Sequence, residues 1–345
     1  MATISVMILT YNHAPYLAQA IESVLKQETT HALDIFIMED CSTDGTQDIV
    51  RQYIQKYPDR VRARMHKKNI GGRKGVQQAV YEGFMQLNGD YCAILEGDDY
   101  WSDLHKLEKQ VSFLEVHPEF VMASHNTVKT YEDGTPSHRF MYNDGIKPVH
   151  NIHDFVALSS FFHISTLVFR NMRKLTKDRS FEYIKNPWCC DIYLLIAHAQ
   201  FGKLHYVNED MSVYRCHKGG TFSNMPAREG RLFNINGHRR FNRWLRYRYL
   251  KGFSFAIFRL CRGVLKACDK GELPPLSSAR YYKYKWLGEF YGKVYDFIDN
   301  HPRLDPAVFW YGEPPKASEP RFEKIRGYEP DEVAAEASPL LQKVS

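Results

Sequence analysis

A group of carboxylates, Glu96-Gly97-Asp98-Asp99, follows directly on a short apolar run from Tyr91 to Leu95. Such a run is typical of a buried strand, so the acidic side chains are expected at the carboxyl end of that strand. Clustered carboxylate oxygens can hold a hard divalent cation, which can also bind two phosphate oxygens of a ligand. The segment therefore predicts a cation site, and the competing interpretation of an isolated E-G-D-D sequence is a solvated acidic turn.

Two further polar segments follow apolar runs in the same way. Thr10, Tyr11 and Asn12 come after residues 4–9, and Asp40 comes after residues 33–38. A carboxylate at Asp40 can accept the N3–H of uracil or another base edge, and an aromatic ring at Tyr11 can stack on the base. These residues predict a nucleotide pocket, although an aromatic residue in a turn also occurs without any ligand.

A segment rich in glycine and cations, Asn69-Ile70-Gly71-Gly72-Arg73-Lys74-Gly75, precedes a predicted helix. Backbone amides at a helix N-terminus, together with Arg73, suit anionic phosphates. The segment lacks the G-K-[ST] ending of a Walker loop, and a plain glycine-rich turn at Gly71 remains an equal alternative.

The elements that must position these residues alternate between strand and helix. Apolar runs at 4–9, 33–38 and 91–95 predict strands, and helical spacing of apolar residues predicts helices at about 17–25, 49–57 and 76–87. This alternation predicts an α/β fold with a doubly wound parallel sheet, in which ligands bind beyond the carboxyl ends of the strands. All three polar segments follow strands, so they are expected at one rim.

The rest of the chain is less regular. Strands are predicted at 121–131, 166–169 and 204–207, and a helix at about 191–200. The composition predicts a catalytic domain over 1–225, a basic, aromatic-rich helical extension over 226–313 and a loose polar tail over 314–345.

Composition restricts the setting of the protein. A chain of 345 residues with 44% hydrophobic residues can bury a large core, and its formal charge of +6 suits anionic partners. Its seven cysteines show no CxxC pair, and no run of about 20 apolar residues or signal peptide is present. A cytoplasmic protein, dissolved or peripheral on the inner face of a membrane, is the expectation.

At the level of motifs the chain resembles glycosyltransferase family 2, over roughly residues 3–225. Residues 5–12, Ser-Val-Met-Ile-Leu-Thr-Tyr-Asn, are similar to the family's first strand and turn, and residues 37–44 to its V-D-D-G-S-T-D segment, with Glu39 and Cys41 as departures. The resemblance implies a GT-A fold and the transfer of a sugar, with inversion, from a nucleotide diphosphate-sugar that is expected to be UDP-linked. It also implies Mn²⁺ or Mg²⁺ as cofactor. It implies that Asp40 binds the base, and that Asp98 and Asp99 contact the metal, Asp98 also facing the donor.

The resemblance extends to two later segments. Pro187-Trp188-Cys189-Cys190-Asp191 is similar to the family's segment in which an acidic residue before an apolar helix is the catalytic base, a role that falls on Asp191. Taken without the family, Asp191 is a good helix N-cap. Val213-Tyr214-Arg215-Cys216-His217 resembles the V-Y-R-x-H ending, which implies that His217 approaches the diphosphate or metal.

The basic segment from Arg239 to Lys266 offers a second kind of hypothesis, because it mixes cations with aromatic residues and contains no acid. It could lie on an anionic membrane, where a lipid-linked or glycan acceptor would be found, or pack its aromatic residues on the catalytic domain with its arginines in water. No nucleic-acid recognition module accompanies it. The alternative functions are a nucleotidyltransferase and a peripheral membrane protein that binds a nucleotide sugar without turnover.

Overall fold

The computed structural model describes residues 1–70, 72–131, 135–140, 146–157, 162–175, 191–220 and 227–301, and for 72–77, 136–140, 175, 191 and 227–229 it describes the backbone only. The chain divides into two compact units, one of Met1–Ile152 with Phe161–Gly219 and one of His153–Ser160 with Gly220–Ser345. Each unit is described by itself. The predicted domain boundaries at 225 and 313, and the predicted tail, fall outside the described residues and stay predictions.

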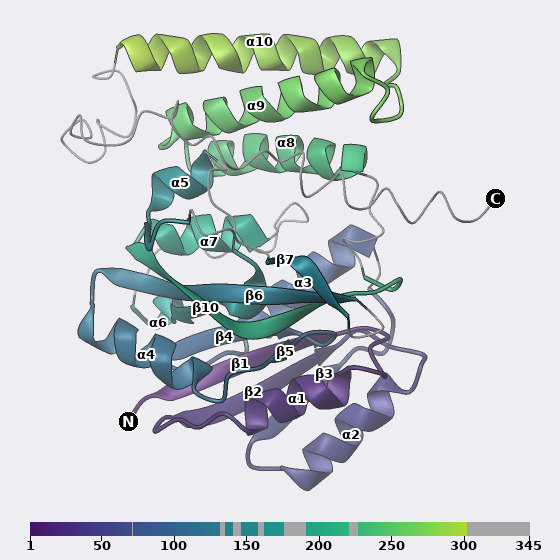
Figure 1. The fold of residues 1–345 in the computed structure, drawn as a ribbon, viewed down its shortest axis with the longest axis vertical. Coiled ribbons are helices and arrows are strands. Elements are labelled where there is room, and N and C mark those ends of the chain that lie inside the picture. Colours follow the sequence, from purple (N-terminus) through teal and green to yellow (C-terminus); the bar gives the residue numbers. More distant parts are fainter. Residues whose placement is uncertain are drawn as a thin grey trace. The chain divides into compact units, whose positions relative to one another are not determined.

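The first unit is built on one mixed sheet with the strand order β3-β2-β1-β4-β9-β6-β10-β5, to which β7 and β8 are added by pairing with β6 and β10 (Figure 1). The strands are β1 (Thr3–Thr10), β2 (Ala32–Glu39), β3 (Val61–Met65), β4 (Tyr91–Glu96), β5 (Tyr100–Trp101), β6 (Phe120–Tyr131), β7 (Pro136–Phe140), β8 (Val149–His150), β9 (Val168–Arg170) and β10 (Lys203–Cys216).

The helices of this unit cover the sheet. They are α1 (Leu17–Leu25), α2 (Thr46–Lys56), α3 (Gly72–Phe84), α4 (Lys106–Val116), α6 (Met172–Leu175) and α7 (Asp191–Ala199), with a short 3₁₀ helix, η1 (Ile164–Thr166). In α1, Leu17, Ala20, Ile21 and Val24 are buried, which is the i, i+3, i+4, i+7 pattern of one helix face. They join a core formed with β1, β2 and β4, whose apolar runs are buried because these strands lie inside the sheet.

The predicted strand and helix pattern is confirmed for the part that forms the polar rim. β1, β2, β3 and β4 are parallel, and the register places Thr10 opposite Glu39 and Leu9 opposite Glu96. The carboxyl ends of the three strands that carry the polar segments therefore lie side by side. Beyond β4 the sheet is mixed, because β9 runs antiparallel to both β4 and β6.

Several strands differ from the sequence-based prediction: the short strands β5, β7 and β8 were not predicted, and β3 and β10 differ in ways that can be explained. β3 was not predicted, because it lies at the sheet edge, only Val61 is buried, and its sequence Val-Arg-Ala-Arg-Met is not an apolar run. β10 extends to Cys216 instead of ending near Val207, with register shifts between Val207 and Ser212 that break its regular alternation. The unpredicted half of β10 matters for function, since it ends beside the carboxylates that follow β4.

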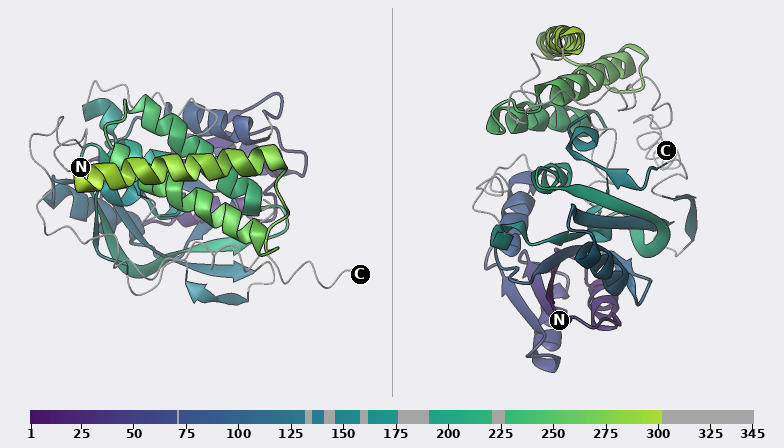
Figure 2. Two further views of the ribbon diagram at one scale, coloured as in Figure 1. Left: turned by 90° about the horizontal axis from the view of Figure 1, so that it is seen from above. Right: turned by 90° about the vertical axis from the view of Figure 1, so that its left-hand side faces the viewer.

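The second unit is helical and contains α5 (Ile152–Val156, of which residues 153–156 fall in this unit), α8 (Ala227–Trp244), α9 (Leu250–Asp269) and α10 (Ser278–Asn300). α9 lies between α8 and α10, as Figures 1 and 2 show from different directions. A Cβ atom at Gly292 would come within 3.1 Å of the Phe258 ring, so glycine lets α10 approach α9 closely. The core of this unit includes Leu232, Ile235, Ile257, Val264 and Leu287.

The basic segment 239–266 thus folds into parts of α8 and α9 and is not one continuous interfacial helix. Phe241, Phe253 and Ile257 are fully buried, and the Phe241 and Phe253 rings meet edge to face. The segment thus buries part of its apolar surface within the helical unit, whereas Trp244 is only partly buried and Tyr247 is exposed. Packing of the segment on the catalytic domain stays a prediction.

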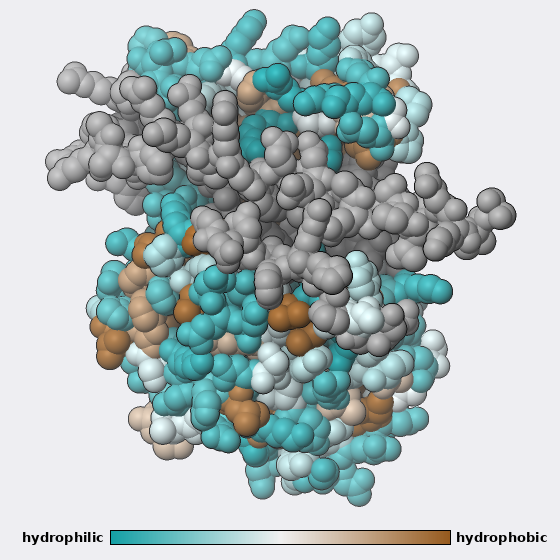
Figure 3. Space-filling model, in the orientation of Figure 1, coloured by the Kyte–Doolittle hydropathy of each residue, from teal (hydrophilic) through white to brown (hydrophobic). Residues whose placement is uncertain are grey.

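The surface of the described part of the first unit carries no large apolar patch on the face drawn in Figure 3. Its apolar side chains are scattered among hydrophilic ones, as is normal for a folded domain. Among the described residues, no helix is both long and apolar enough to cross a membrane.

Candidate active site at the rim of the sheet

The turns after β1 and β2 are joined by hydrogen bonds into one structure. Asn12 donates its backbone N–H to Ser42 Oγ at 2.8 Å, and its Oδ1 accepts from the Thr43 N–H at 2.9 Å. Asn12 adopts a φ of 53°, in the left-handed region that asparagine tolerates better than most residues. Within the described residues the contacts of Asn12 are structural, and they fix the exposed Tyr11 at the edge of the rim.

Glu39 organises the turn that carries Asp40. The Glu39 carboxylate is fully buried and accepts the backbone N–H groups of Cys41, at 3.1 Å, and Ser42, at 2.5 Å. Cys41 has a φ of 59°, a conformation that favours glycine, so the cysteine at this position is accommodated with backbone strain. Asp44 Oδ1 accepts from the Thr46 N–H at 3.0 Å and from the Thr46 hydroxyl at 2.6 Å, but the N-cap of α2 is Gly45 and no side chain caps the helix.

The carboxylate of Asp40 is held through one of its two oxygens. Its Oδ1 accepts the Ile70 N–H at 3.0 Å and lies 3.0 Å from His66 Nδ1. Among the described residues every hydrogen bond to the Asp40 carboxylate falls on Oδ1, which leaves Oδ2 to accept from a ligand. Thr10 lies beside it, with its Oγ1 buried and without a hydrogen-bond partner in the described part of the chain.

The end of β10 brings a second set of side chains to the rim. The Arg215 N–H donates to Asp99 Oδ1 at 3.0 Å, and its guanidinium donates to the Asp98 carbonyl and stacks over the Tyr16 and Tyr100 rings. These contacts fix the last residues of β10 against the acidic turn. They also place His217, two residues further on, over Asp98.

His13, Asp98 and His217 form a compact cluster. Asp98 Oδ2 lies 2.9 Å from His217 Nε2 and 3.6 Å from His13 Nε2, and the three ligand atoms are all within 4.8 Å of one another. Burial raises the pKa of Asp98, but the hydrogen bond with His217 and the nearby His13 outweigh it and hold the pKa below its usual range. Gly97 makes room for this arrangement, because a Cβ there would lie 3.0 Å from His13 Nδ1.

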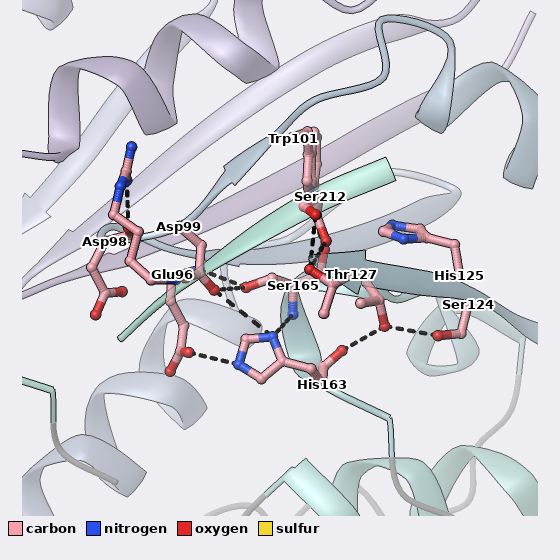
Figure 4. A network of polar contacts seen from close by, with 12 residues as sticks. Glu96, Asp98, Asp99, Trp101, Ser124, His125, Thr127, His163, Ser165 and Ser212 are labelled. Carbon is pink, nitrogen blue, oxygen red and sulfur yellow. Dashed lines mark hydrogen bonds and ion pairs between the residues drawn. The ribbon is translucent and has the colours of Figure 1, made fainter. Parts of the chain in front are cut away.

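A second cluster, Glu96, Asp99 and His163, lies deeper. Figure 4 shows His163 between Glu96 and Asp99, with His163 Nε2 3.0 Å from Glu96 Oε2 and Nδ1 3.8 Å from Asp99 Oδ2. Ser165 donates its N–H to His163 Nδ1 and its hydroxyl to Asp99 Oδ2. Asp99 is only 1% exposed, and burial raises its pKa well above the usual range.

The first cluster fits a divalent cation better than the second. Two atoms bonded to one ion at about 2.1 Å lie about 3.0 to 3.4 Å apart, close to the spacings measured around Asp98 Oδ2. Asp98 Oδ1 is buried and has no hydrogen-bond partner among the described residues, which an ion would explain. Both oxygens of Asp99, in contrast, already accept hydrogen bonds, from Arg215 and Ser165.

Several predicted site residues cannot be placed in this geometry. Asp191 is the first residue of α7, but its side chain lies outside the described part of the structure. The same holds for Arg73, and Gly71 falls outside the described residues altogether. Their roles stay predictions.

Sequence reasoning missed His13 and His163. His13 was within reach, because it stands next to the Tyr11-Asn12 turn. His163 carries no local signal, since it meets Glu96 across 67 positions of sequence.

The sequence that forms this fold and rim matches a known protein family. The family model described as glycosyl transferase family 2 matches residues 5–186, more than half of the chain. The chain belongs to glycosyl transferase family 2. The protein Rv1520 of Mycobacterium tuberculosis, described as uncharacterized, is 29% identical over 235 residues, which cover 68% of this chain and 64% of the relative. The present chain thus spans somewhat less than two thirds of the length of Rv1520.

Two further relatives place the fold. TuaG of Bacillus subtilis, provisionally described as a teichuronic acid biosynthesis glycosyltransferase, is 32% identical over 152 residues, 42% of this chain and 57% of TuaG. A crystal structure of Staphylococcus aureus TarS residues 1–349 in complex with UDP-GlcNAc superposes with a TM-score of 0.51 at 13% identity, covering 87% of this chain and 92% of that one. The mixed sheet with its flanking helices is the GT-A fold.

Proposed function

We propose that this protein is a metal-dependent glycosyltransferase that moves a sugar from a nucleotide diphosphate-sugar, UDP-linked, to an acceptor hydroxyl with inversion. The observation that carries the proposal is the meeting of Asp40, Asp98 and His217 at one rim, from the ends of three different strands. A carboxylate after β2 that can bind a base and a cation site around the turn after β4, with β1 between these two strands, suit the two ends of a nucleotide diphosphate.

The base is assigned to the pocket beside Asp40. Its Oδ2 can accept the N3–H of uracil, while the exposed ring of Tyr11 can stack on the base. Cytosine has an acceptor at N3, so a carboxylate at this place disfavours it. The complex of TarS with UDP-GlcNAc supports a UDP-sugar, because that protein shares the fold.

The cation is assigned to His13, Asp98 and His217, with Asp99 as a residue that positions Asp98 and the end of β10. When bound, the ion would neutralise negative charge on the departing diphosphate as a Lewis acid. Imidazole ligands suit transition ions better than Mg²⁺, which prefers oxygen, so the cluster favours Mn²⁺ over Mg²⁺.

Asp191 is proposed as the general base. It would take the proton of the acceptor hydroxyl while that oxygen bonds to the anomeric carbon and the bond to the diphosphate breaks, its electron pair leaving with the phosphate oxygen. Attack from the face opposite the diphosphate inverts the anomeric centre. Given the name of TuaG, the acceptor is proposed to be a growing surface polysaccharide or a lipid-linked glycan.

The experiment is a thermal-shift panel of UDP, GDP, CDP and ADP sugars with and without Mn²⁺, followed by a nucleotide-release assay with the stabilising donor. Binding to the native state raises the melting temperature, so the donor should stabilise the protein chiefly when Mn²⁺ is present. Full turnover in excess chelator would refute metal dependence. Stabilisation without any nucleotide release, with water or a panel of glycan acceptors, would favour a protein that binds the donor without turnover.

A further inference from the structure

The outer face of α10 carries a row of exposed aromatic side chains. Tyr282 is 68% exposed, Trp286 61%, Phe290 46% and Phe297 54%. The Trp286 and Phe290 rings stack with their centroids 5.5 Å apart, so the side chains form a continuous surface. We call these four residues the aromatic stripe.

Helix geometry places the stripe on one side of α10. Positions 282, 286, 290 and 297 fall within an arc of about 80° and extend over roughly 22 Å along the axis. Tyr284, Leu287 and Ile298 are buried on the opposite side. The side of α10 that packs on α9 is thus already satisfied, and the stripe is an additional apolar surface that the helical unit does not bury.

The helical unit also holds the positive charge of the protein. Residues 230–301 contain fifteen Lys and Arg but only five Asp and Glu, whereas the whole chain has a formal charge of +6. The remainder is therefore slightly acidic. Lys283 and Lys293 are exposed beside the stripe, and Arg262 and Lys266 are exposed on α9, while Glu289 and Asp296 are the exposed acids nearest to the stripe on α10.

We propose that the aromatic stripe of α10 docks this protein onto the surface of an anionic lipid bilayer. Exposed Trp, Tyr and Phe on one face of a helix, flanked by lysines, are the features of helices that lie in the membrane interface. A protein partner fits less well, because lysine is depleted at the centre of protein interfaces and helix geometry places the exposed Lys293 within the arc of the stripe. The surface differs from the basic segment 239–266, in which Phe241, Phe253 and Ile257 are fully buried.

The experiment is sedimentation of the full chain with vesicles of phosphatidylcholine alone or with 30% phosphatidylglycerol, at low and high salt. Binding is expected with the anionic vesicles only, weakening as salt screens the lysines. Trp286 should also shift its fluorescence to shorter wavelength on binding, and Trp286→Phe should remove most of that shift.

Variants separate the two contributions. Trp286→Ser with Phe290→Ser should weaken binding by at least about tenfold through lost apolar burial. Lys283→Gln with Lys293→Gln should weaken it by about 30-fold, taking the usual contribution of a basic residue near an anionic surface. Tyr131→Ser, which removes an exposed aromatic ring from the other unit, is the matched control and should change nothing.

Other results would overturn the proposal. Equal binding to both vesicle types, or vesicle binding unchanged by the stripe variants, would show that α10 is not the docking surface. A self-associated species in analytical ultracentrifugation that Trp286→Ser with Phe290→Ser dissociates, without vesicle binding by the wild type, would assign the stripe to contact with a second copy. Donor binding is measured separately, so either conclusion is independent of the glycosyltransferase proposal.

Discussion

Replacing His13 by alanine should weaken Mn²⁺ binding, because the structure makes His13 one of three ligands around Asp98 Oδ2. His217→Ala should act in the same direction, and Asp98→Asn should have the largest effect, because it removes the negative charge. The motif alone assigns the ion to Asp98 and Asp99, so the effect of Asp99→Asn distinguishes the two ligand sets. If the cluster binds the ion, Asp99→Asn should leave Mn²⁺ affinity within about tenfold of the wild type.

The size of the effect follows from the contacts. Loss of a residue that only orients a metal ligand usually costs 10- to 100-fold in metal affinity, and His13 is placed to contact the ion itself, so about 100-fold is the expected loss. This corresponds to about 2.7 kcal/mol. Asp99→Asn should instead lower the free energy of unfolding by about 1 to 3 kcal/mol, because an amide cannot accept both hydrogen bonds from Arg215 and Ser165.

The assay is a Mn²⁺ titration followed by electron paramagnetic resonance, with and without UDP, together with urea denaturation of each variant. His31→Ala is the control. His31 is a buried histidine that pairs with Glu108 and, among the described residues, contacts none of His13, Asp98 and His217. Wild-type Mn²⁺ affinity in His13→Ala and His217→Ala, combined with its loss in Asp99→Asn, would refute the assignment and return the ion to the two aspartates.

Three other predictions test separate parts of the protein. Asp191→Asn should lower turnover by about 10²- to 10⁴-fold at saturating substrates and leave calorimetric donor affinity nearly unchanged, whereas a residue that only caps α7 would tolerate asparagine. Asp40→Asn should weaken UDP binding by about 10- to 100-fold and CDP binding less, because an amide N–H next to N3 opposes uracil and suits cytosine; equal losses in calorimetry would contradict the base assignment. Lys106 is fully buried with its Nζ 3.9 Å from the Trp101 ring centroid, and burial lowers the pKa of its ammonium group well below the usual value. Lys106→Met should therefore raise the free energy of unfolding at pH 7 by about 1 to 3 kcal/mol. Because the unfolded chain binds the proton more readily, wild-type stability rises with pH and the gain should shrink toward pH 10; urea denaturation showing a less stable variant at pH 7 would count against this.

The parallel strands β1, β2 and β4, and the polar residues at their ends, could be predicted from the sequence. The runs 4–9, 33–38 and 91–95 are almost continuously apolar, interrupted only by Ser5 and Asp34, because β1, β2 and β4 are covered on both faces, and this is a local pattern. Parallel pairing then brings Thr10, Asp40 and the acidic turn to one rim. An edge strand such as β3 escapes detection, because two of its five residues are arginines and only Val61 is buried.

Which carboxylate of the acidic turn can bind an ion depends on the tertiary structure. Asp98 and Asp99 are neighbours of identical type, yet one faces His13 and His217 while the other is buried under Ser165 and the Arg215 N–H. The partners come from β1, η1 and the end of β10, and the irregular pairing of β10 with β6 sets where that end lies. Such long-range contacts have no spacing in the sequence, because they depend on how the strands are ordered in the sheet.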